Sequence, residues 1–245
     1  MEKTTLKPVA IVTGGSKGIG RAISIELAQS GYHVIANYHS DDNAATELVE
    51  QIKDTGGSAE KVKFDVKDTE ASEKAINEIT SRSNTVDVLV NNAGIISDEL
   101  FIMMTAKKWD EVIDTTLKGF FNVTRPVLQK MVKQKNGAIV SISSAAGLMA
   151  NRGQANYSAA KAGLIGASRT ISAEVARLGI RVNVVAPGLI ETDMLKDVPL
   201  ADLKTIIPMA RIGKPDEVAK VVKFLCSADA SYIAGQVISV NGGMF

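Results

Sequence analysis

Short apolar runs alternate with longer amphipathic stretches along the whole chain, and this alternation limits the fold more than any other feature. The apolar runs are continuous and rich in Val and Ile, as is typical of strands buried on both faces of a sheet. The predicted strands are Val9–Thr13, His33–Tyr38, Glu60–Asp65, Val86–Val90, Ala138–Ser143, Arg181–Ala186 and Gln236–Val240. The predicted helices between them are Ile19–Gln29, Ala44–Thr55, Glu70–Ser81, Trp109–Lys133, Tyr157–Leu178 and Pro215–Ser227.

Strands that alternate with helices of ten or more residues form right-handed βαβ units, which place the strands in one parallel sheet. No internal repeat and no Pro- or Ser-rich linker interrupts the series. We therefore predict an α/β fold with a single domain over residues 1–245. It is a doubly wound (Rossmann-type) parallel sheet of seven strands with helices on both faces.

Composition excludes several classes of function. Hydrophobic residues make up 45% of the chain and the net charge is +1, so we expect a globular protein that attracts neither nucleic acid nor an anionic membrane. Cys226 is the only cysteine, and His33 and His39 are the only histidines, so we expect no internal disulfide and no metal site. No secretory leader or membrane-spanning run is visible, and we expect a cytoplasmic protein.

A glycine-rich loop, Thr13–Gly20, follows the first predicted strand and opens the first predicted helix. Glycine permits the tight turn and lets a pyrophosphate approach the backbone. The N-terminus of the following helix adds unpaired N–H groups and the positive end of its dipole. The loop therefore predicts a site for a dinucleotide.

The residues after the second predicted strand indicate which dinucleotide binds. An acidic residue there would hold the ribose 2′-hydroxyl of NAD, but the strand ends at Tyr38 without a carboxylate. Lys17 of the glycine loop can place a positive charge beside a 2′-phosphate. Asp41 and Asp42 lie close by in the sequence, and they would oppose this interpretation if the strand ended later. NADPH is the predicted cofactor.

The segment Asn91–Gly94 follows the fourth predicted strand. In a doubly wound sheet, ligands lie across the carboxyl ends of the strands, where small residues let the chain pass close beneath a cofactor. We expect the Asn92 side chain to join neighbouring strand ends by hydrogen bonds.

Tyr157 and Lys161 lie four residues apart at the start of a long predicted helix, so they share one helical face. An ammonium about 5 Å from a phenol contributes roughly 3 kcal/mol toward the phenolate at an effective dielectric near 20. We therefore expect the pKa of Tyr157 to fall to about 7.5, where it exchanges a proton at neutral pH. Ser144 follows the fifth predicted strand and can reach the same rim to hold a substrate carbonyl oxygen.

A serine hydrolase is the rival interpretation for Ser143 or Ser144. That chemistry needs a base, and the only imidazoles in the chain lie near the second predicted strand. The Gly-x-Ser-x-Gly turn of the α/β-hydrolases is also absent from the sequence. The hydrolase interpretation is therefore excluded.

These segments together resemble the short-chain dehydrogenase/reductase family. The resemblance rests on Thr13–Gly20, Asn91–Gly94, Ser144, Tyr157 with Lys161, and Pro187–Thr192, and it extends to Val240–Gly243. Within that family the chain is most similar to the 3-oxoacyl-[acyl-carrier-protein] reductases, particularly over Gly153–Tyr157 and Ile190–Met194.

The resemblance implies an NADPH-dependent reductase that forms a homotetramer. In it Tyr157 is the general acid, Ser144 positions the carbonyl, and Lys161 binds the nicotinamide ribose and tunes Tyr157. The implied cofactor contacts are Gly14, Ser16, Lys17, Gly18, Ile19, Asn37, Asp65, Val66, Asn92, Gly94, Tyr157, Lys161, Pro187, Gly188, Ile190 and Thr192.

One residue departs from the family's pattern. The family places an asparagine in the helix before the fifth strand, where it helps to hold a water that leads to the lysine, and this chain has Thr116 there. A threonine hydroxyl can donate and accept a hydrogen bond and would hold the same water less rigidly, so Thr116 is counted with the predicted catalytic residues. Activity is expected to be retained because Tyr157, Lys161 and Ser144 are all present.

The favoured substrate is a β-ketoacyl group on an acyl carrier protein, or another β-ketoacyl compound, and the product is the β-hydroxyacyl form. The apolar segment from Leu189 to Ile212 is predicted to form a substrate lid. Because acyl carrier proteins are acidic, basic residues are expected near the cleft, and the candidates are Lys130, Lys133, Lys135, Arg169 and Arg177.

Three alternatives stay open. The first is another small carbonyl or alcohol substrate, and the second is a polyketide or polyene intermediate. The third is a weakly active, NADP-binding partner subunit, which only Thr116 favours.

Overall fold

The computed structural model describes residues 7–192 and 206–245, and it contains the predicted parallel sheet. The strands are β1 (Val9–Val12), β2 (His33–Tyr38), β3 (Ser58–Lys63), β4 (Val88–Asn91), β5 (Gly137–Ile142), β6 (Ile180–Pro187) and β7 (Val237–Val240). They form one seven-stranded sheet in the order β3-β2-β1-β4-β5-β6-β7, and every neighbouring pair is parallel. The predicted fold class is confirmed.

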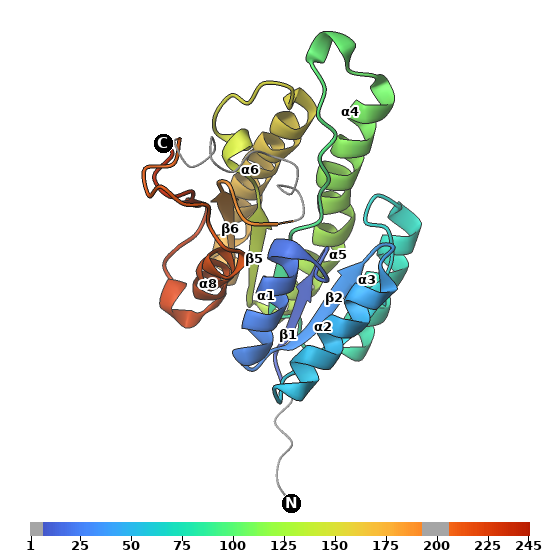
Figure 1. Cartoon of the computed structure of the whole chain (residues 1–245). Coiled ribbons are helices and arrows are strands. Elements are labelled where there is room, and N and C mark those ends of the chain that lie inside the picture. Colours follow the sequence, from blue (N-terminus) through green and yellow to red (C-terminus); the bar gives the residue numbers. More distant parts are fainter. Residues whose placement is uncertain (1–6, 193–205) are drawn as a thin grey trace, which may run out of the picture.

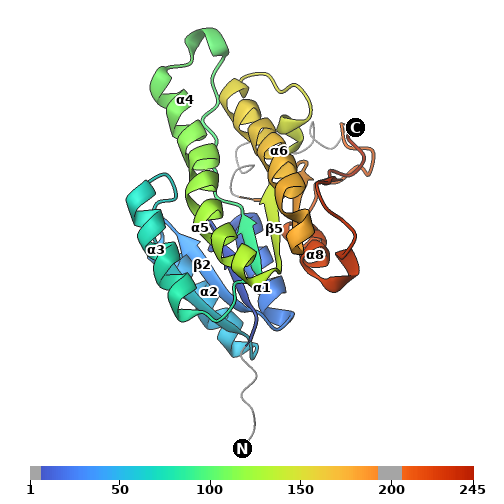
Figure 2. The same cartoon turned by 180° about the vertical axis from the view of Figure 1, so that it is seen from behind.

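Helices cover both faces of the sheet. One face carries α1 (Gly18–Gln29), α2 (Asp42–Asp54) and α8 (Pro215–Cys226), which lie in front of the strands in Figure 1. The opposite face carries α3 (Thr69–Arg82), α5 (Gly119–Gln134) and α6 (Ala155–Val175), as Figure 2 shows. In the described part of the chain, no helix is both long enough and apolar enough to span a bilayer.

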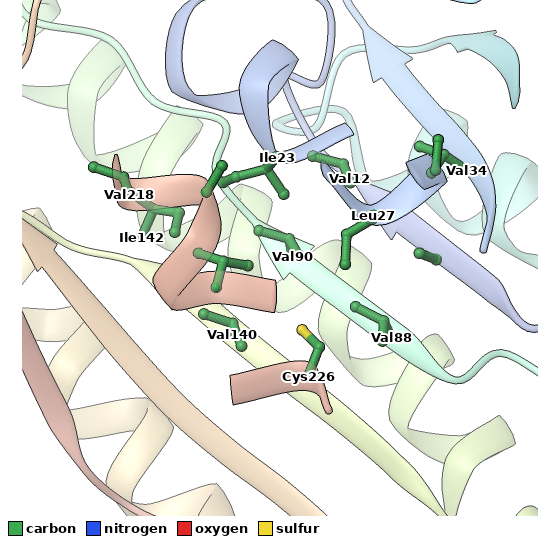
Figure 3. Close-up of a cluster of buried hydrophobic side chains, with 14 of the residues drawn as sticks. Val12, Ile23, Leu27, Val34, Val88, Val90, Val140, Ile142, Val218 and Cys226 are labelled. Atoms are coloured by element: carbon green, nitrogen blue, oxygen red, sulfur yellow. The ribbon is translucent and has the colours of Figure 1, made fainter. Parts of the chain in front are cut away.

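The alternation of side chains along each strand explains why the apolar runs are continuous. On the face of α1 and α8, buried side chains of Val12, Val90 and Val140 pack with Ile23 and Leu27 (Figure 3). Their strand neighbours point to the opposite face, where they join a second core with α3 and α5. The members of that core on β1, β4 and β5 are Val9, Ile11, Leu89 and Ile139. Both faces of the sheet are therefore buried.

The helix predicted over Trp109–Lys133 has different bounds in the structure, and its middle part is π-helical. It begins earlier as α4 (Ala106–Ile113), continues as a π-helical segment (Asp114–Lys118), and ends as α5 at Gln134. Hydrophobic periodicity does not distinguish α from π spacing over so few residues, and the sequence therefore predicted one uninterrupted α-helix.

Most of the predicted substrate lid, Leu189 to Ile212, lies outside the described residues. The two described ends of this segment are joined by backbone hydrogen bonds. Gly213 N donates to Leu189 O (3.0 Å), and Glu191 N donates to Gly213 O (2.8 Å). The chain at Leu189 and Glu191 therefore lies beside Gly213, just past the other end of the predicted lid.

Candidate active site

A cavity of about 760 Å³ lies at the carboxyl ends of the strands. Residues that follow β1, β3, β4, β5 and β6 line it, as expected for a doubly wound sheet. All of the predicted catalytic and cofactor-binding residues line this cavity except Ser16 and Thr116, which are buried. The structure therefore brings the predicted site together from segments far apart in the sequence.

Hydrogen bonds between Thr13 and Asn92 join the exits of β1 and β4. Asn92 Nδ2 donates to Thr13 O and to Gly14 O, both at 3.0 Å. In return, Thr13 Oγ1 accepts from Asn92 N (3.0 Å) and from Ala93 N (3.1 Å). The predicted role of Asn92 in joining strand ends is confirmed.

The glycine loop fits a pyrophosphate group. Gly14 and Gly18 have positive φ angles of 58° and 50°, which favour glycine. At Gly20 a Cβ atom would lie 2.1 Å from Gly14 O, so the loop can pack against α1 only without a side chain there. At Gly18, in contrast, the nearest neighbour of a Cβ would be Thr192 Cγ2 at 3.4 Å, which leaves an open cradle at the N-terminus of α1.

Asn37 shapes the wall of this loop. Its Oδ1 accepts from Gly14 N (3.2 Å), and its Nδ2 donates to Phe64 O (2.9 Å). The buried side chain thereby connects the glycine loop to the exit of β3. These bonds occupy the Asn37 amide in holding the loop.

The two carboxylates after β2 do not line the cavity, although Asp41 lies against Lys17, which does. Asp41 accepts from Ala44 N (3.0 Å) at the start of α2 and forms an ion pair with Lys17. Asp42 accepts from Lys61 Nζ (2.8 Å). Lys17 lines the cavity and neither aspartate does, but Asp41 pairs with the Lys17 ammonium, so a 2′-phosphate at this place would share that ammonium with a carboxylate.

The cavity wall beyond β2 and β3 carries charges of both signs. Asp65 Oδ2 lies 3.5 Å from His39 Nε2 and 3.7 Å from Lys67 Nζ. The sequence prediction missed both of these contacts. The only clue in the sequence is that His39 directly follows β2 and Lys67 lies four residues after β3.

Ser144 and Tyr157 both line the cavity, and their hydroxyl groups interact. Ser144 follows β5, and Tyr157 lies in the first turn of α6. Burial raises the pKa of Tyr157 above 10.0, the interaction with Ser144 opposes that rise, and the negative charge of Asp98 adds to it. The predicted fall of this pKa to about 7.5 is wrong, because the cost of burying the phenolate outweighs the favourable contributions.

Lys161 is buried one turn deeper in α6. Its Nζ donates to Ile142 O (2.8 Å) and lies 5.6 Å from the centre of the Tyr157 ring. Burial lowers the pKa of Lys161 from 10.5 to about 8. A Cβ on Gly94 would come within 3.3 Å of this Nζ, so the small residue after β4 leaves the lysine its space.

Thr116 is buried beside the same glycine. Its Oγ1 would lie 3.5 Å from a Cβ on Gly94, and it has no hydrogen-bond partner among the described residues. Its neighbour Thr115 lines the cavity instead, which the sequence prediction missed. The π-helical segment places the two threonines in these different surroundings.

Part of the cavity lining is apolar. The apolar residues include Ile95, Ile96, Met149, Ile206 and Met244. The sequence prediction missed all of these except Ile206, because they come from four separate segments that only the fold brings together. Apolar lining of this kind fits the hydrocarbon part of a ligand.

The basic residues proposed from sequence to border the cleft do not line the cavity. Lys130 and Lys133 lie near the end of α5, and Lys135 follows that helix directly before β5 begins. Arg177 precedes β6 in the same way. These four residues lie toward the amino ends of the strands, opposite the cavity, because the connecting helices run antiparallel to the sheet. The predicted location was therefore wrong for them, and Arg169, within α6, also lies outside the lining.

Comparisons with known proteins agree with this geometry. The family model described as short chain dehydrogenase matches residues 8–202. A 3-oxoacyl-[acyl-carrier-protein] reductase FabG of Staphylococcus aureus is 45% identical over 239 residues, which are 96% of this chain and 97% of that protein. The reductase of that name from Synechocystis sp. is 45% identical over 237 residues, 96% of each chain, and the FabG of Thermotoga maritima is 43% identical over 239 residues, 96% of this chain and 97% of its own. The chain belongs to the short-chain dehydrogenase family.

The lowered pKa of Lys161 predicts a pH-dependent contribution to stability. Below pH 8 the amine is protonated in both the folded and unfolded states, and the cost of burying the ammonium is fully present. Between about pH 8 and 10.5 the unfolded state binds more protons, so the folded state gains stability as the pH rises. From pH 7 to 10, denaturant unfolding should therefore show wild type gaining on the order of 1–3 kcal/mol relative to Lys161→Met.

The matched control is Lys133→Met, because Lys133 is exposed. Its free-energy difference from wild type should stay constant over the same pH range. A difference for Lys161→Met that is equally constant would contradict the lowered pKa.

Proposed function

We propose that this short-chain dehydrogenase uses NADPH to reduce a 3-oxoacyl group on acyl carrier protein to the β-hydroxyacyl form. The observation that most supports this proposal is that Ser144, Tyr157 and Lys161 line the same cavity as the glycine loop. The apolar residues in the cavity lining suit an acyl chain. The names of the similar proteins from Staphylococcus aureus and Thermotoga maritima support the same substrate class.

The carbonyl oxygen of the substrate would lie between the hydroxyls of Ser144 and Tyr157. The nicotinamide, when bound, supplies the hydride that reduces the β-carbon. Tyr157 gives its phenolic proton to the oxygen, so the ketone gains one hydride and one proton and becomes an alcohol. Since its raised pKa keeps the phenol protonated at neutral pH, Tyr157 is in the correct form to act as an acid.

Lys161 would act on the proton supply to Tyr157. Its pKa of about 8 lets the amine gain or lose a proton near neutral pH. Its Nζ lies 5.6 Å from the Tyr157 ring centre, within reach of a hydroxyl or water between the two groups. In this proposal the amine also holds the nicotinamide ribose.

The preference for NADPH is supported by the residues at the exit of β2. Lys17, from the glycine loop, lines the cavity, whereas its ion-pair partner Asp41 and the next residue, Asp42, lie outside the lining. A ribose 2′-hydroxyl would find no acidic partner directly after β2, whereas a 2′-phosphate would meet the Lys17 ammonium.

We also propose that the protein is a homotetramer. Large apolar side chains are exposed near α4 and α5, at Phe101, Ile102, Met103 and Phe121. A second exposed group lies near the C-terminus, at Phe224, Tyr232 and Phe245. Two separate apolar surfaces are what an assembly with two kinds of interface needs.

Replacing Tyr157 by Phe removes the proposed acid and leaves the ring. With NADPH and acetoacetyl thioesters of acyl carrier protein, coenzyme A and N-acetylcysteamine, kcat should fall by about 10²–10⁴-fold. NADPH fluorescence should report a dissociation constant within about threefold of wild type. Turnover that survives Tyr157→Phe would mean that another group supplies the proton.

Replacing Lys17 by Gln tests the cofactor preference. The dissociation constant for NADPH should rise by about tenfold, as expected for the loss of one charged contact, while that for NADH changes by less than about twofold. Lys133→Gln is the control for the change in net charge. If Lys17→Gln raised the dissociation constants of NADPH and NADH equally, the 2′-phosphate of NADPH would not contact Lys17.

Replacing Thr116 by Asn tests whether the departure from the family's pattern limits turnover. Because Ser144, Tyr157 and Lys161 are all present, kcat should change by at most about tenfold, little more than 1.4 kcal/mol in the barrier. A gain of several hundredfold would instead support the alternative of a weakly active partner subunit.

A further inference from the structure

Asn156 directly precedes Tyr157, and its side chain is fully buried. Its Oδ1 accepts from Tyr157 N (2.8 Å). Its Nδ2 donates to Ser97 O (3.0 Å) and to Lys108 O (3.1 Å). One amide thus connects the start of α6 to the segment after β4 and to α4.

The first turn of α6 needs such a connection. The N–H groups at the start of a helix have no acceptor within the helix, and at this helix the N-cap residue, Gln154, makes no side-chain capping bond. Asn156 gives the N–H of Tyr157 its acceptor. The residue that carries the phenol is therefore held by its own neighbour.

Two further bonds align the same segments. Glu99 N donates to Gly153 O (2.9 Å), and Gln154 Nε2 donates to Asp98 Oδ2 (2.9 Å). The segment Ser97–Glu99 consequently runs along the start of α6. Of the three side chains that make these bonds, only that of Asn156 is buried, whereas Gln154 is half-buried and Asp98 is exposed.

Lys161 is held by different partners. Its Nζ donates to Ile142 O, and its own carbonyl accepts from Ser143 Oγ (2.8 Å). These contacts attach the second turn of α6 to the end of β5. Loss of the Asn156 amide should therefore displace Tyr157 more than Lys161.

We propose that Asn156 is the positioning residue for Tyr157, which it holds in register with Ser144 by fastening the first turn of α6 to Ser97 and to α4. This inference rests on the proposed function, in which Tyr157 donates the proton. A shift of about 1 Å in a reacting group is enough to cost about a hundredfold in rate.

The test compares Asn156→Ala with Asn183→Ala. Asn183 is equally buried and makes the same kinds of bond: its Nδ2 donates to Ile233 O (2.8 Å), and its Oδ1 accepts from Gln236 N (3.0 Å). Unlike Asn156, which adjoins Tyr157, it has no partner or chain neighbour in the cavity lining. Both variants should lower Tm. Only Asn156→Ala should lower kcat, by about 10–100-fold with a larger solvent isotope effect, while KM and the NADPH dissociation constant stay within about threefold.

A second measurement does not depend on the substrate. Ultraviolet titration of the phenol, taken as the difference between each protein and its Tyr157→Phe counterpart, isolates the ionisation of Tyr157. In wild type the pKa should lie above 10.0, and in Asn156→Ala it should fall toward that value as the ring becomes more hydrated. In Asn183→Ala the pKa of Tyr157 should equal that of wild type.

The two hypotheses fail in different ways. If wild type reduces no β-ketoacyl thioester, the proposed function is wrong, and the phenol titration still decides the role of Asn156. If Asn156→Ala matches Asn183→Ala in kcat, isotope effect and phenol titration, the positioning role is overturned. Should Asn156→Ala not fold, Asn156→Ser is measured against the same criteria.

Discussion

The hydrogen bonds between Thr13 and Asn92 are the contact on which the site depends. They join β1 and β4, where the strand order reverses and the following helices leave to opposite faces of the sheet. The two segments that follow these strands diverge and leave a crevice between them. Hydrogen bonds between its edges fix the width of this crevice. The glycine loop lies on one edge and Gly94 on the other, so both the cofactor cradle and the space for Lys161 follow from this contact.

Burial acts in opposite directions on the two titratable groups of the site. It raises the pKa of Tyr157 and lowers that of Lys161 to about 8, because each change disfavours a buried charge. The phenol is therefore kept as a proton donor, and the amine becomes the group that changes charge near neutral pH. The sequence argument considered only the attraction between ammonium and phenolate, and it therefore expected the phenol to change charge near neutral pH.

The sequence predicted the sheet and most of the cavity lining because both depend on local patterns: continuous apolar runs, glycines after a strand, and two residues one helical turn apart. It did not predict the pKa of Tyr157, which depends on burial, or the location of Lys130 and Lys135, which depends on the direction of a helix. It also gave no sign of the contacts of Asn156, whose partners Ser97 and Lys108 are 59 and 48 residues away. Sequence patterns identify which residues carry chemistry, whereas long-range packing decides how they are held.

The π-helical segment Asp114–Lys118 carries one residue more per turn than the helices on either side. Loss of a single residue here would restore α spacing without breaking the helix, and it would rotate the side chains before the deletion by about 100° relative to α5. Thr115 and Thr116 would then exchange surroundings with their neighbours while every strand stayed in place. Insertions and deletions of one residue, normally tolerated only in loops, are thus a route by which descendants of this chain can remodel the active site from within a helix.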